Sequence, residues 1–597
     1  MKTLFRGIFA LALLSLSKAA IGQAGNCRAG TSKADIESEN VRARVMNQGD
    51  FFWEPAASLA RFQWPKNSSP GKHLVFAAAH WFGGKDLATG DLIVSAQTYR
   101  GAMRTFWPGP AVAGILPDSS ECAFWNRHFE IDRATVLMYM ATTNTSGVPY
   151  NVGIIPTKVL KWPGRGNPFL KAEALAAGYS HISAFDQELA PFIDKDGDGV
   201  YNPTMGDYPD LKGKLAAVWW VMNDVGNTKN FNSNITPSPG VNLEFQTMAY
   251  SYPMQDNQHY LANSIFIDLK IINRGSRTLD TCYTSFWSDI DLGYANDDLV
   301  QCDVMRNLGI CYNGDNMDEG TSGYGTNPPA IAFKAIDGPM AYPADGIDND
   351  RDGIVDEPGE KSLFSGFRAY WTTGSSESSP TPQAAPQFYN FMTGKWNDGY
   401  PTTYGGQGLN PVSSTSPATK FFYPGSSDPI GYGMGGTPQN PMVQPEWSEI
   451  TAGNIKGDRR ICMSAGPFQL VPGSSVHYTI GNLVAFGGTN LENIAQLGLI
   501  SDSLDQYRPT LIPTERKENI GETTLSIFPN PGSEVVLFEC QSTIKKLIIR
   551  DLQGRLVFQS MPERTLVSTN LEMLPSGIYS VQVLTTKGVQ VKKLVKL

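Results

Sequence analysis

Three aspartates at alternate positions are the residues most suited to binding chemistry. Asp194, Asp196 and Asp198 are followed by Gly199 and then by Asn202. This spacing suits a hard cation, because alternate carboxylates turn toward one centre and the glycine permits the sharp bend after the third ligand. The sequence therefore predicts a calcium-binding loop in which Asn202 supplies a further oxygen.

Two later residues refine this prediction. Met205 stands at the twelfth position, where an EF-hand has glutamate, so a flanking helix-loop-helix is not expected. Asp207 is the next carboxylate along the chain, and we expect it to close the ligand shell.

A second aspartate run repeats the same logic and strengthens the prediction for both. Its carboxylates are Asp348, Asp350, Asp352 and Asp356. Both runs resemble the D-x-D-x-D-G calcium loops of dockerins and thrombospondin type 3 repeats. The expected role of calcium is structural, because such loops have too little apolar content to order themselves and a cation offsets repulsion between carboxylates.

A third acidic group has irregular spacing, so its role stays open between metal binding and surface or catalytic carboxylates. Its members are Asp289, Asp291, Asp297, Asp298 and Asp303.

Most catalytic signatures are missing from the sequence. The chain has no G-x-S-x-G, H-E-x-x-H or P-loop pattern, and none of its six histidines are paired four residues apart. Zinc proteases and nucleophile-elbow hydrolases are therefore disfavoured. The glycine run 431–436 lacks the flanking strand and helix of a dinucleotide site. A glycosidase stays possible, because it needs only two carboxylates about 5–10 Å apart.

The elements that must position these residues are predicted to be mainly strands. The 597 residues include 59 Gly and 40 Pro, with only 18% charged and 11% aromatic residues, which favours packed, turn-rich β structure. At 265–271, Ile265, Ile267, Leu269 and Ile271 alternate with other residues and give one wholly apolar face. A helix is expected over 491–507. Strands are expected at 74–83, 92–100, 215–222, 242–252, 263–273 and 476–486.

The predicted fold class is mainly β, with a multidomain β-sandwich architecture and a C-terminal immunoglobulin-like domain. The expected parts are a signal peptide at 1–22, a β-rich domain at 23–165, a linker with the first calcium-type loop at 166–214, a central β-sandwich region with the second loop at 215–510, and the last domain at 518–597.

The N-terminal residues and the charge of the chain indicate where the protein works. Lys2 and Arg6 precede a short apolar run and then a small-residue cleavage pattern, as in a signal peptide. No later stretch reaches 18 apolar residues, so no transmembrane segment is expected in the mature chain. The net charge of −9 disfavours nucleic acid as a partner. The cysteine number is odd, at seven, so at least one is unpaired within the chain.

The last 80 or so residues carry an ordered set of motifs. These are Pro529-Asn530-Pro531, the D-x-x-G-R turn from Asp551 to Arg555, the L-P-x-G-x-Y strand from Leu574 to Tyr579, and a basic end. Over about 522–597 the set resembles the type A C-terminal sorting domain of the type IX secretion system of Bacteroidetes. The resemblance implies export across the outer membrane, with the secretion machinery as partner of residues 522–597.

The body also resembles long uncharacterised exported Bacteroidetes proteins over most of 38–486, through motifs such as Trp287-Ser-Asp289-Ile-Asp291 and Gly457-Asp-Arg-Arg460. That resemblance implies no activity. We expect a secreted or outer-membrane-surface structural or binding protein with calcium-stabilised loops, adhesive or binding an extracellular polysaccharide or cell-surface glycan. The alternative is a secreted carbohydrate-active hydrolase, with the Asp289 and Asp291 region as the place for its acid and base.

Overall fold

The computed structural model describes most of the chain and divides it into two compact units, Met1–Leu511 and Ile512–Leu597. The predicted signal peptide at 1–22 lies outside the described residues. Those residues are 27–68, 71–99, 105–143, 151–225, 240–254, 259–371, 381–408, 415–511, 525–533, 535–551, 556–585 and 588–597.

The first unit is built on two large antiparallel sheets. The described strands of the first sheet number ten and follow the order β23-β24-β17-β8-β3-β2-β6-β7, with β1 paired to β2 and β9 paired to β8. Their bounds are β1 Lys33–Glu37, β2 Arg42–Met46, β3 Asp50–Phe51, β6 Phe62–Gln63, β7 His73–Val75, β8 Ala77–Asp86, β9 Leu92–Ser95, β17 Leu279–Ile290, β23 Gly366–Tyr370 and β24 Arg459–Leu470.

The second sheet has nine described strands in the order β10-β14-β15-β16-β25-β22-β19-β18, with β11 paired to β14. Their bounds are β10 Trp107–Pro108, β11 Phe129–Asp132, β14 Ala216–Asn223, β15 Leu243–Ser251, β16 Phe266–Asn273, β18 Asp298–Asp303, β19 Leu308–Asn313, β22 Ala330–Asp337 and β25 Ser475–Ala485.

Short elements complete this unit. Three two-stranded ribbons pair β4 Trp53–Glu54 with β5 Leu59–Ala60, β12 Phe192–Ile193 with β13 Tyr208–Pro209, and β20 Met317–Asp318 with β21 Gly325–Thr326. The helices are α1 Ser119–Trp125, α2 Arg133–Ala141, α3 Thr157–Leu160, α4 Pro168–Ala176, α5 His259–Ala262, α6 Ala385–Met392 and α7 Asn490–Leu511, with 3-10 turns η1 Val152–Ile154, η2 Ile182–Asp186 and η3 Tyr432–Met434.

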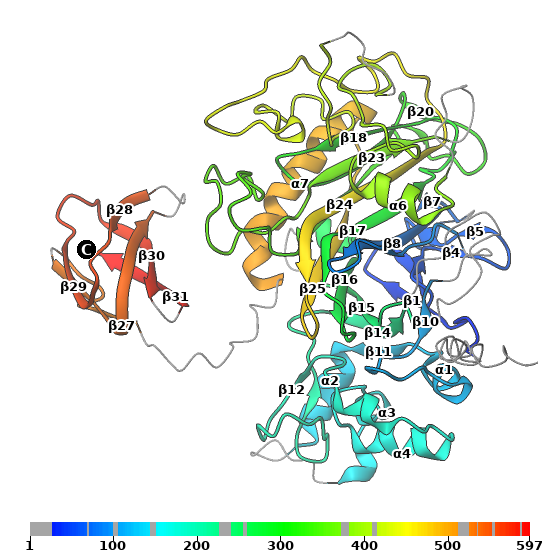
Figure 1. Ribbon diagram of the computed structural model, residues 1–597, viewed down its shortest axis with the longest axis horizontal. Coiled ribbons are helices and arrows are strands. Elements are labelled where there is room, and N and C mark those ends of the chain that lie inside the picture. The colour runs from blue at the N-terminus through cyan, green and yellow to red at the C-terminus, as the bar shows by residue number, and fades with distance from the viewer. Residues whose placement is uncertain are drawn as a thin grey trace, which may run out of the picture. The chain divides into compact units, whose positions relative to one another are not determined.

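The main core lies between the two sheets, as in a sandwich. Successive side chains of a strand point to opposite faces. Phe286 of β17 therefore meets Phe333 of β22 in the core, with ring centroids 4.7 Å apart. Its neighbour Trp287 points outward and joins the cluster under α6, where the Trp81 and Phe388 rings lie 4.8 Å apart. On the outer face of the second sheet, α7 packs against β25 and β22 (Figure 1).

The expected division into an N-terminal and a central domain differs from the structure. Strand β8, from the N-terminal region, lies between β3 and β17 in the first sheet, and β11 pairs with β14 in the second. Residues 27–165 and 215–511 therefore share both sheets. The segment 166–214, expected as a linker, is folded as well, because Leu170, Phe185 and Tyr201 are fully buried. Local patterns do not reveal such long-range pairing.

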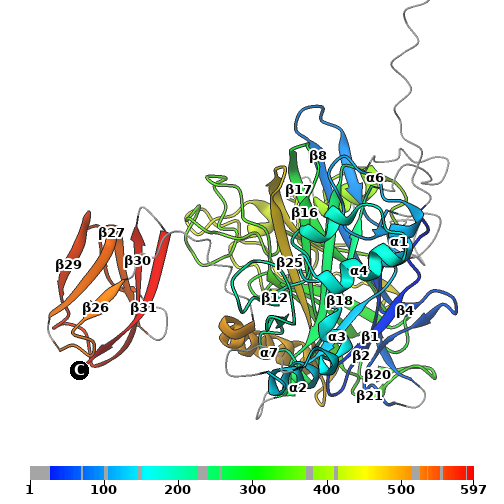
Figure 2. The same ribbon diagram turned by 90° about the horizontal axis from the view of Figure 1, so that it is seen from below.

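The second unit holds the C-terminal strands around one long central strand. The first half of β27, Val535–Arg550, pairs with β26 Ser526–Phe528 and β29 Arg564–Asn570. Its second half pairs with β28 Leu556–Ser560 and β30 Gly577–Thr585, and β31 Gly588–Lys596 follows (Figure 2). The core contains Phe538, Ile549 and Val581. This is the predicted sandwich-like C-terminal domain, and the chain as a whole is mainly β.

Candidate functional site

The first calcium-type loop is held at its base by the β12–β13 ribbon. Asp194, Asp196 and Asp198 each offer an oxygen within 4.8 Å of the others, so the predicted convergence of three carboxylates is present. The Asp194 carboxylate accepts hydrogen bonds from the backbone N–H of Gly197 at 2.7 Å and of Gly199 at 2.8 Å. Gly197 has a positive φ of 78°, a conformation that favours glycine. The loop is thus shaped by its own backbone donors.

The other two predicted residues of this loop brace it. Asp207, fully buried, accepts hydrogen bonds from the N–H groups of Lys195 at 2.8 Å and Asn202 at 2.7 Å, and so joins both ends of the loop. The Asn202 side-chain oxygen accepts from the hydroxyl of Thr204 at 2.7 Å. Asp207 lies outside the group of three converging carboxylates.

The second loop brings Asp348, Asp350 and Asp352 together within the same 4.8 Å limit. Asp348 is only 1% exposed, and its Oδ2 accepts from the N–H of Gly353 at 3.0 Å and from the Tyr432 hydroxyl at 3.1 Å. Its Oδ1 is buried without a hydrogen-bond partner among the described residues. Because a buried carboxylate oxygen requires a partner, these residues fit a bound cation.

One predicted member of this loop lies outside the converging groups, and two further carboxylates converge with Asp350. Both oxygens of Asp356 accept from the N–H of Gly346, at 3.0 and 3.1 Å, and Asp356 stands outside the converging groups. Glu357 and Glu360 instead converge with Asp350. Burial raises the pKa of Glu360 to about 7, and the nearby carboxylates add to the shift. Aspartate spacing alone did not point to these glutamates, although Glu357 directly follows the run.

The end of β17 forms a different acidic cluster, in which Asp289, Asp291 and Asp458 converge. In the β17–β24 ladder Asp289 lies opposite Arg460. Arg460 contacts Asp289 Oδ1 at 3.2 Å and Asp458 Oδ1 at 2.8 Å, and the Tyr99 hydroxyl donates to Asp289 Oδ2 at 2.5 Å. The sequence singled out Asp289 and Asp291 as candidates for chemistry. Asp458 and Arg460 stand in a motif that carries a resemblance, without an expected role, and Tyr99 comes from another distant segment.

A pocket of about 270 Å³ opens beside this cluster, and Asp291 lines it together with His73, Phe76, Tyr294 and Asn296. Burial raises the pKa of Asp291 well above its ordinary value, and the neighbouring carboxylates add to this. Burial also raises the pKa of Asp289 to about 6, against the opposing effect of Arg460. The pocket therefore offers the Asp291 carboxyl together with the aromatic side chains of Phe76 and Tyr294.

The remaining members of the third acidic group have other hydrogen-bond and ion-pair partners. The Asp297 carboxylate accepts from the N–H of Glu319 at 3.2 Å, and Asp298 accepts from that of Leu292 at 3.1 Å. Asp303 forms an ion pair with Arg306 at 3.0 Å. Of the five aspartates, the structure thus brings together Asp289 and Asp291.

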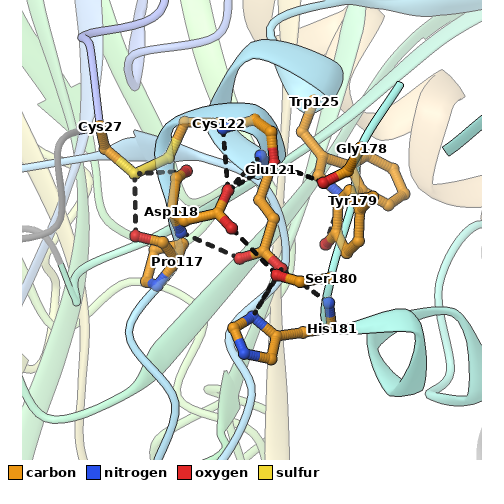
Figure 3. A network of polar contacts seen from close by, with 11 residues as sticks. Cys27, Pro117, Asp118, Glu121, Cys122, Trp125, Gly178, Tyr179, Ser180 and His181 are labelled. Carbon is orange, nitrogen blue, oxygen red and sulfur yellow. Dashed lines mark hydrogen bonds and ion pairs between the residues drawn. A yellow bond between two sulfur atoms is a disulfide. The ribbon is translucent and has the colours of Figure 1, made fainter. Parts of the chain in front are cut away.

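One further acidic group surrounds the described disulfide, Cys27–Cys122 (Figure 3). Glu121 and Asp118 form the capping box of α1, and Glu121 also accepts from the N–H of His181 at 3.0 Å and contacts its ring at 2.6 Å. Ser180 donates to Asp118 at 2.9 Å. Because these carboxylates are already satisfied, the group braces the N-terminal segment. The other five cysteines are buried thiols, including the near neighbours Cys302 and Cys311.

The comparisons with known proteins identify the C-terminal unit. Residues 526–597 match the family model described as secretion system C-terminal sorting domain. The domain marks the chain as cargo of the type IX secretion system, exported to the cell surface or the extracellular space. No helix among the described residues is long and apolar enough to cross a membrane.

Matches of the chain to solved structures include two distant ones. No curated protein matches it. A polysaccharide lyase of solved structure is 7% identical with a TM-score of 0.18, over 59% of this chain and 34% of that chain. PorZ, a surface component of the type IX secretion system of Porphyromonas gingivalis, is 11% identical with a TM-score of 0.12, over 66% of this chain and 45% of that chain. This chain thus spans less than half of either protein, and such scores do not indicate a shared overall fold.

Proposed function

We propose that the exported body is a surface binding protein, stabilised by calcium at its two aspartate loops, whose ligand is an extracellular polysaccharide or a cell-surface glycan. The pocket beside Asp291 carries the proposal. It combines the rings of Phe76 and Tyr294 with the polar groups of Asp291, Asn296 and His73. Aromatic faces with a few placed hydrogen-bonding groups form a lining that suits a sugar.

Calcium is proposed at Asp194, Asp196 and Asp198 and at Asp348, Asp350 and Asp352. The strongest support comes from the second loop, where Asp348 Oδ1 is buried without a partner among the described residues. A divalent cation would supply that partner and offset the repulsion between the carboxylates.

A secreted carbohydrate-active hydrolase is the second candidate. Two adjacent carboxyls with different environments are the arrangement from which acid and base roles arise. Asp291 would be the acid, because its pKa is the more strongly raised, and Asp289 the ionised partner. Asp289, however, is 3% exposed and held by Tyr99 and Arg460, and only Asp291 lines the pocket. This favours binding over catalysis.

The two functions are separated by offering the full chain a glycan array and a polysaccharide hydrolysis panel. We expect retention of a glycan without release of reducing ends, and a loss of affinity of about tenfold or more in Asp291→Asn, since one charge-assisted or buried hydrogen bond is removed. Asp315→Asn, an exposed residue paired with Lys456, is the matched control. Release of reducing ends that Asp291→Asn abolishes would establish the hydrolase, and unchanged binding in that variant would exclude the pocket.

A further inference from the structure

Tyr432 joins the second calcium-type loop to a segment 84 residues further along the chain. Its hydroxyl donates to Asp348 Oδ2 at 3.1 Å. The segment around it, the 428–436 turn, is organised by Asp428, whose carboxylate accepts from the N–H groups of Gly431 at 3.0 Å, Tyr432 at 2.8 Å and Gly433 at 3.2 Å. Tyr432 is the side chain of this turn that packs against the main core.

The second loop holds Tyr432 through a second side chain as well. The Arg351 guanidinium lies 5.7 Å from the centre of the Tyr432 ring and 5.5 Å from that of Phe421. Arg351 also donates to Asn307 Oδ1 at 2.7 Å and to the carbonyl oxygen of Phe364. The loop is therefore fixed to the core on one side and to the turn on the other.

The turn depends on such anchors, because it lies in a long irregular segment. Between α6 and β24, the described residues 393–408 and 415–458 contain η3 as their single helical element and no strand of the large sheets (Figure 1). The order of this segment comes from isolated backbone hydrogen bonds, such as that from the N–H of Lys420 to the carbonyl oxygen of Gly433 at 2.9 Å, and from side-chain contacts such as that between Tyr432 and Asp348.

The carboxylates of the loop indicate how the Asp348 contact is fixed. Oxygens bound to one calcium ion lie about 2.3–2.6 Å from it, so two ligand oxygens are at most about 5 Å apart. Asp348, Asp350 and Asp352 meet this limit among themselves, and Asp350, Glu357 and Glu360 meet it as a second group, so that the two groups share Asp350. Two oxygens of this set, Asp348 Oδ1 and Glu357 Oε2, are buried without a partner among the described residues.

We propose that Glu357 and Glu360 complete the cation site of the second loop, and that the bound cation latches the 428–436 turn by fixing the Asp348 carboxylate that receives the Tyr432 hydroxyl. The inference rests on the proposed calcium binding. One Asp348 oxygen faces the cation and the other holds Tyr432, so the two events share a side chain. Coupling between two such events is reciprocal, and loss of the hydroxyl must weaken calcium binding as much as calcium strengthens the anchor.

The latch is tested by hydrogen exchange on the full chain, freed of metal with EDTA and then supplied with calcium. Calcium should slow exchange at the amides of the loop and also at those of Gly431, Tyr432 and Gly433, by about tenfold. In Tyr432→Phe, which keeps the ring against Arg351, the loop should still respond while the turn does not. Calcium affinity should fall about three- to tenfold, as expected for one hydrogen bond. If calcium does not change the exchange rates of the turn amides in the wild-type chain, the latch is refuted, while calcium binding at the loop is not.

The ligand set is tested by calorimetric titration of calcium in an Asp196→Asn background. This substitution removes a ligand of the first loop, so that the heat measured comes from the second loop. Glu357→Gln and Glu360→Gln should each weaken binding by about tenfold or more, because each removes a charged ligand. Asp356→Asn is the matched control and should change affinity by less than about threefold. An Asp356→Asn loss as large as that of Glu360→Gln would overturn the ligand set. No heat of binding at all in the Asp196→Asn chain would instead refute calcium at the second loop, and with it that part of the proposed function.

Discussion

The second loop and the pocket cluster both gather at least three carboxylates, yet each offsets their repulsion differently. In the pocket cluster Arg460 contacts both Asp289 and Asp458. In the second loop Arg351 directs its donors to Asn307 and to the Phe364 carbonyl instead of to a carboxylate. Arg460 thus offsets part of the charge of the pocket cluster directly, whereas under the proposed calcium binding a cation from solution does so in the second loop. Carboxylate number alone therefore does not distinguish a metal site from a polar pocket.

Removing the Arg460 guanidinium from the pocket cluster should have the largest effect on stability. Arg460→Met leaves the Asp289 carboxylate buried without its arginine partner. We therefore expect a loss of about 3–5 kcal/mol in the free energy of unfolding at pH 7.5. The substitution raises the pKa of Asp289 further above its unfolded value. A carboxyl with a raised folded-state pKa stabilises the native chain at low pH, where it is protonated, and this stability is lost as the pH rises. The difference in free energy of unfolding between wild type and Arg460→Met should therefore be smaller at pH 5.

Urea unfolding of the full chain at the two pH values measures this effect. A deficit of equal size at pH 5 and 7.5 would show that Arg460 stabilises by packing and not by charge. Lys456→Met, which removes an exposed cation paired with Asp315 and Glu319, is the control and should change stability by less than about 1 kcal/mol.

Removing a ligand from the second loop should have the next largest effect. With calcium at about 100 times its dissociation constant, binding stabilises the native chain by about 2.7 kcal/mol, and Asp348→Asn should lose most of this. Thermal unfolding with calcium and with EDTA checks the prediction, because the wild-type and variant curves should approach each other once calcium is removed. Identical wild-type curves in the two conditions would contradict calcium stabilisation.

Replacing Asp291, the carboxyl that lines the pocket, should raise stability instead of lowering it. Asp291→Asn removes a carboxyl whose pKa burial holds well above the ordinary range, so the variant should be more stable than wild type at pH 7.5. The wild-type chain keeps this stability below about pH 4 and loses it as the pH rises, so the two proteins should coincide near pH 4. Unfolding curves across this range test the sign, and calcium should not alter the difference. A destabilised variant would mark Asp291 as structural.

The first loop should give the smallest change in global stability. Asp196 and Asp198 are exposed, and the loop amides already bond to the aspartates of the loop. With EDTA present, Asp196→Asn should change the free energy of unfolding by less than about 1 kcal/mol, as for most surface substitutions. Limited proteolysis should nevertheless show faster cleavage at 194–202 in the variant with calcium present. Cleavage at the wild-type rate would argue against calcium at this loop.

Short-range patterns predicted the elements well and the sites only in part. The alternation at 265–271 reappears in β16, and the helix expected at 491–507 is α7. The three aspartates of each loop converge because their spacing alone brings them to one centre. Arg460 and Tyr99 could not be assigned to Asp289, since their meeting depends on the β17–β24 register and on a contact across 190 residues. Glu360 was missed because loop curvature, not sequence spacing, brings it to Asp350.

The position of β24 and β25 has a consequence for how the body folds. β24 pairs with β17 in the first sheet, and β25 pairs with both β16 and β22 in the second. A chain that ends before Arg459 lacks inner strands of both sheets, so the N-terminal strands cannot complete their core as they emerge. Contacts of such long sequence separation make folding slow, because loop-closure entropy is paid before the contacts form. The body should therefore fold as one cooperative unit, and only after nearly all of it has been synthesised.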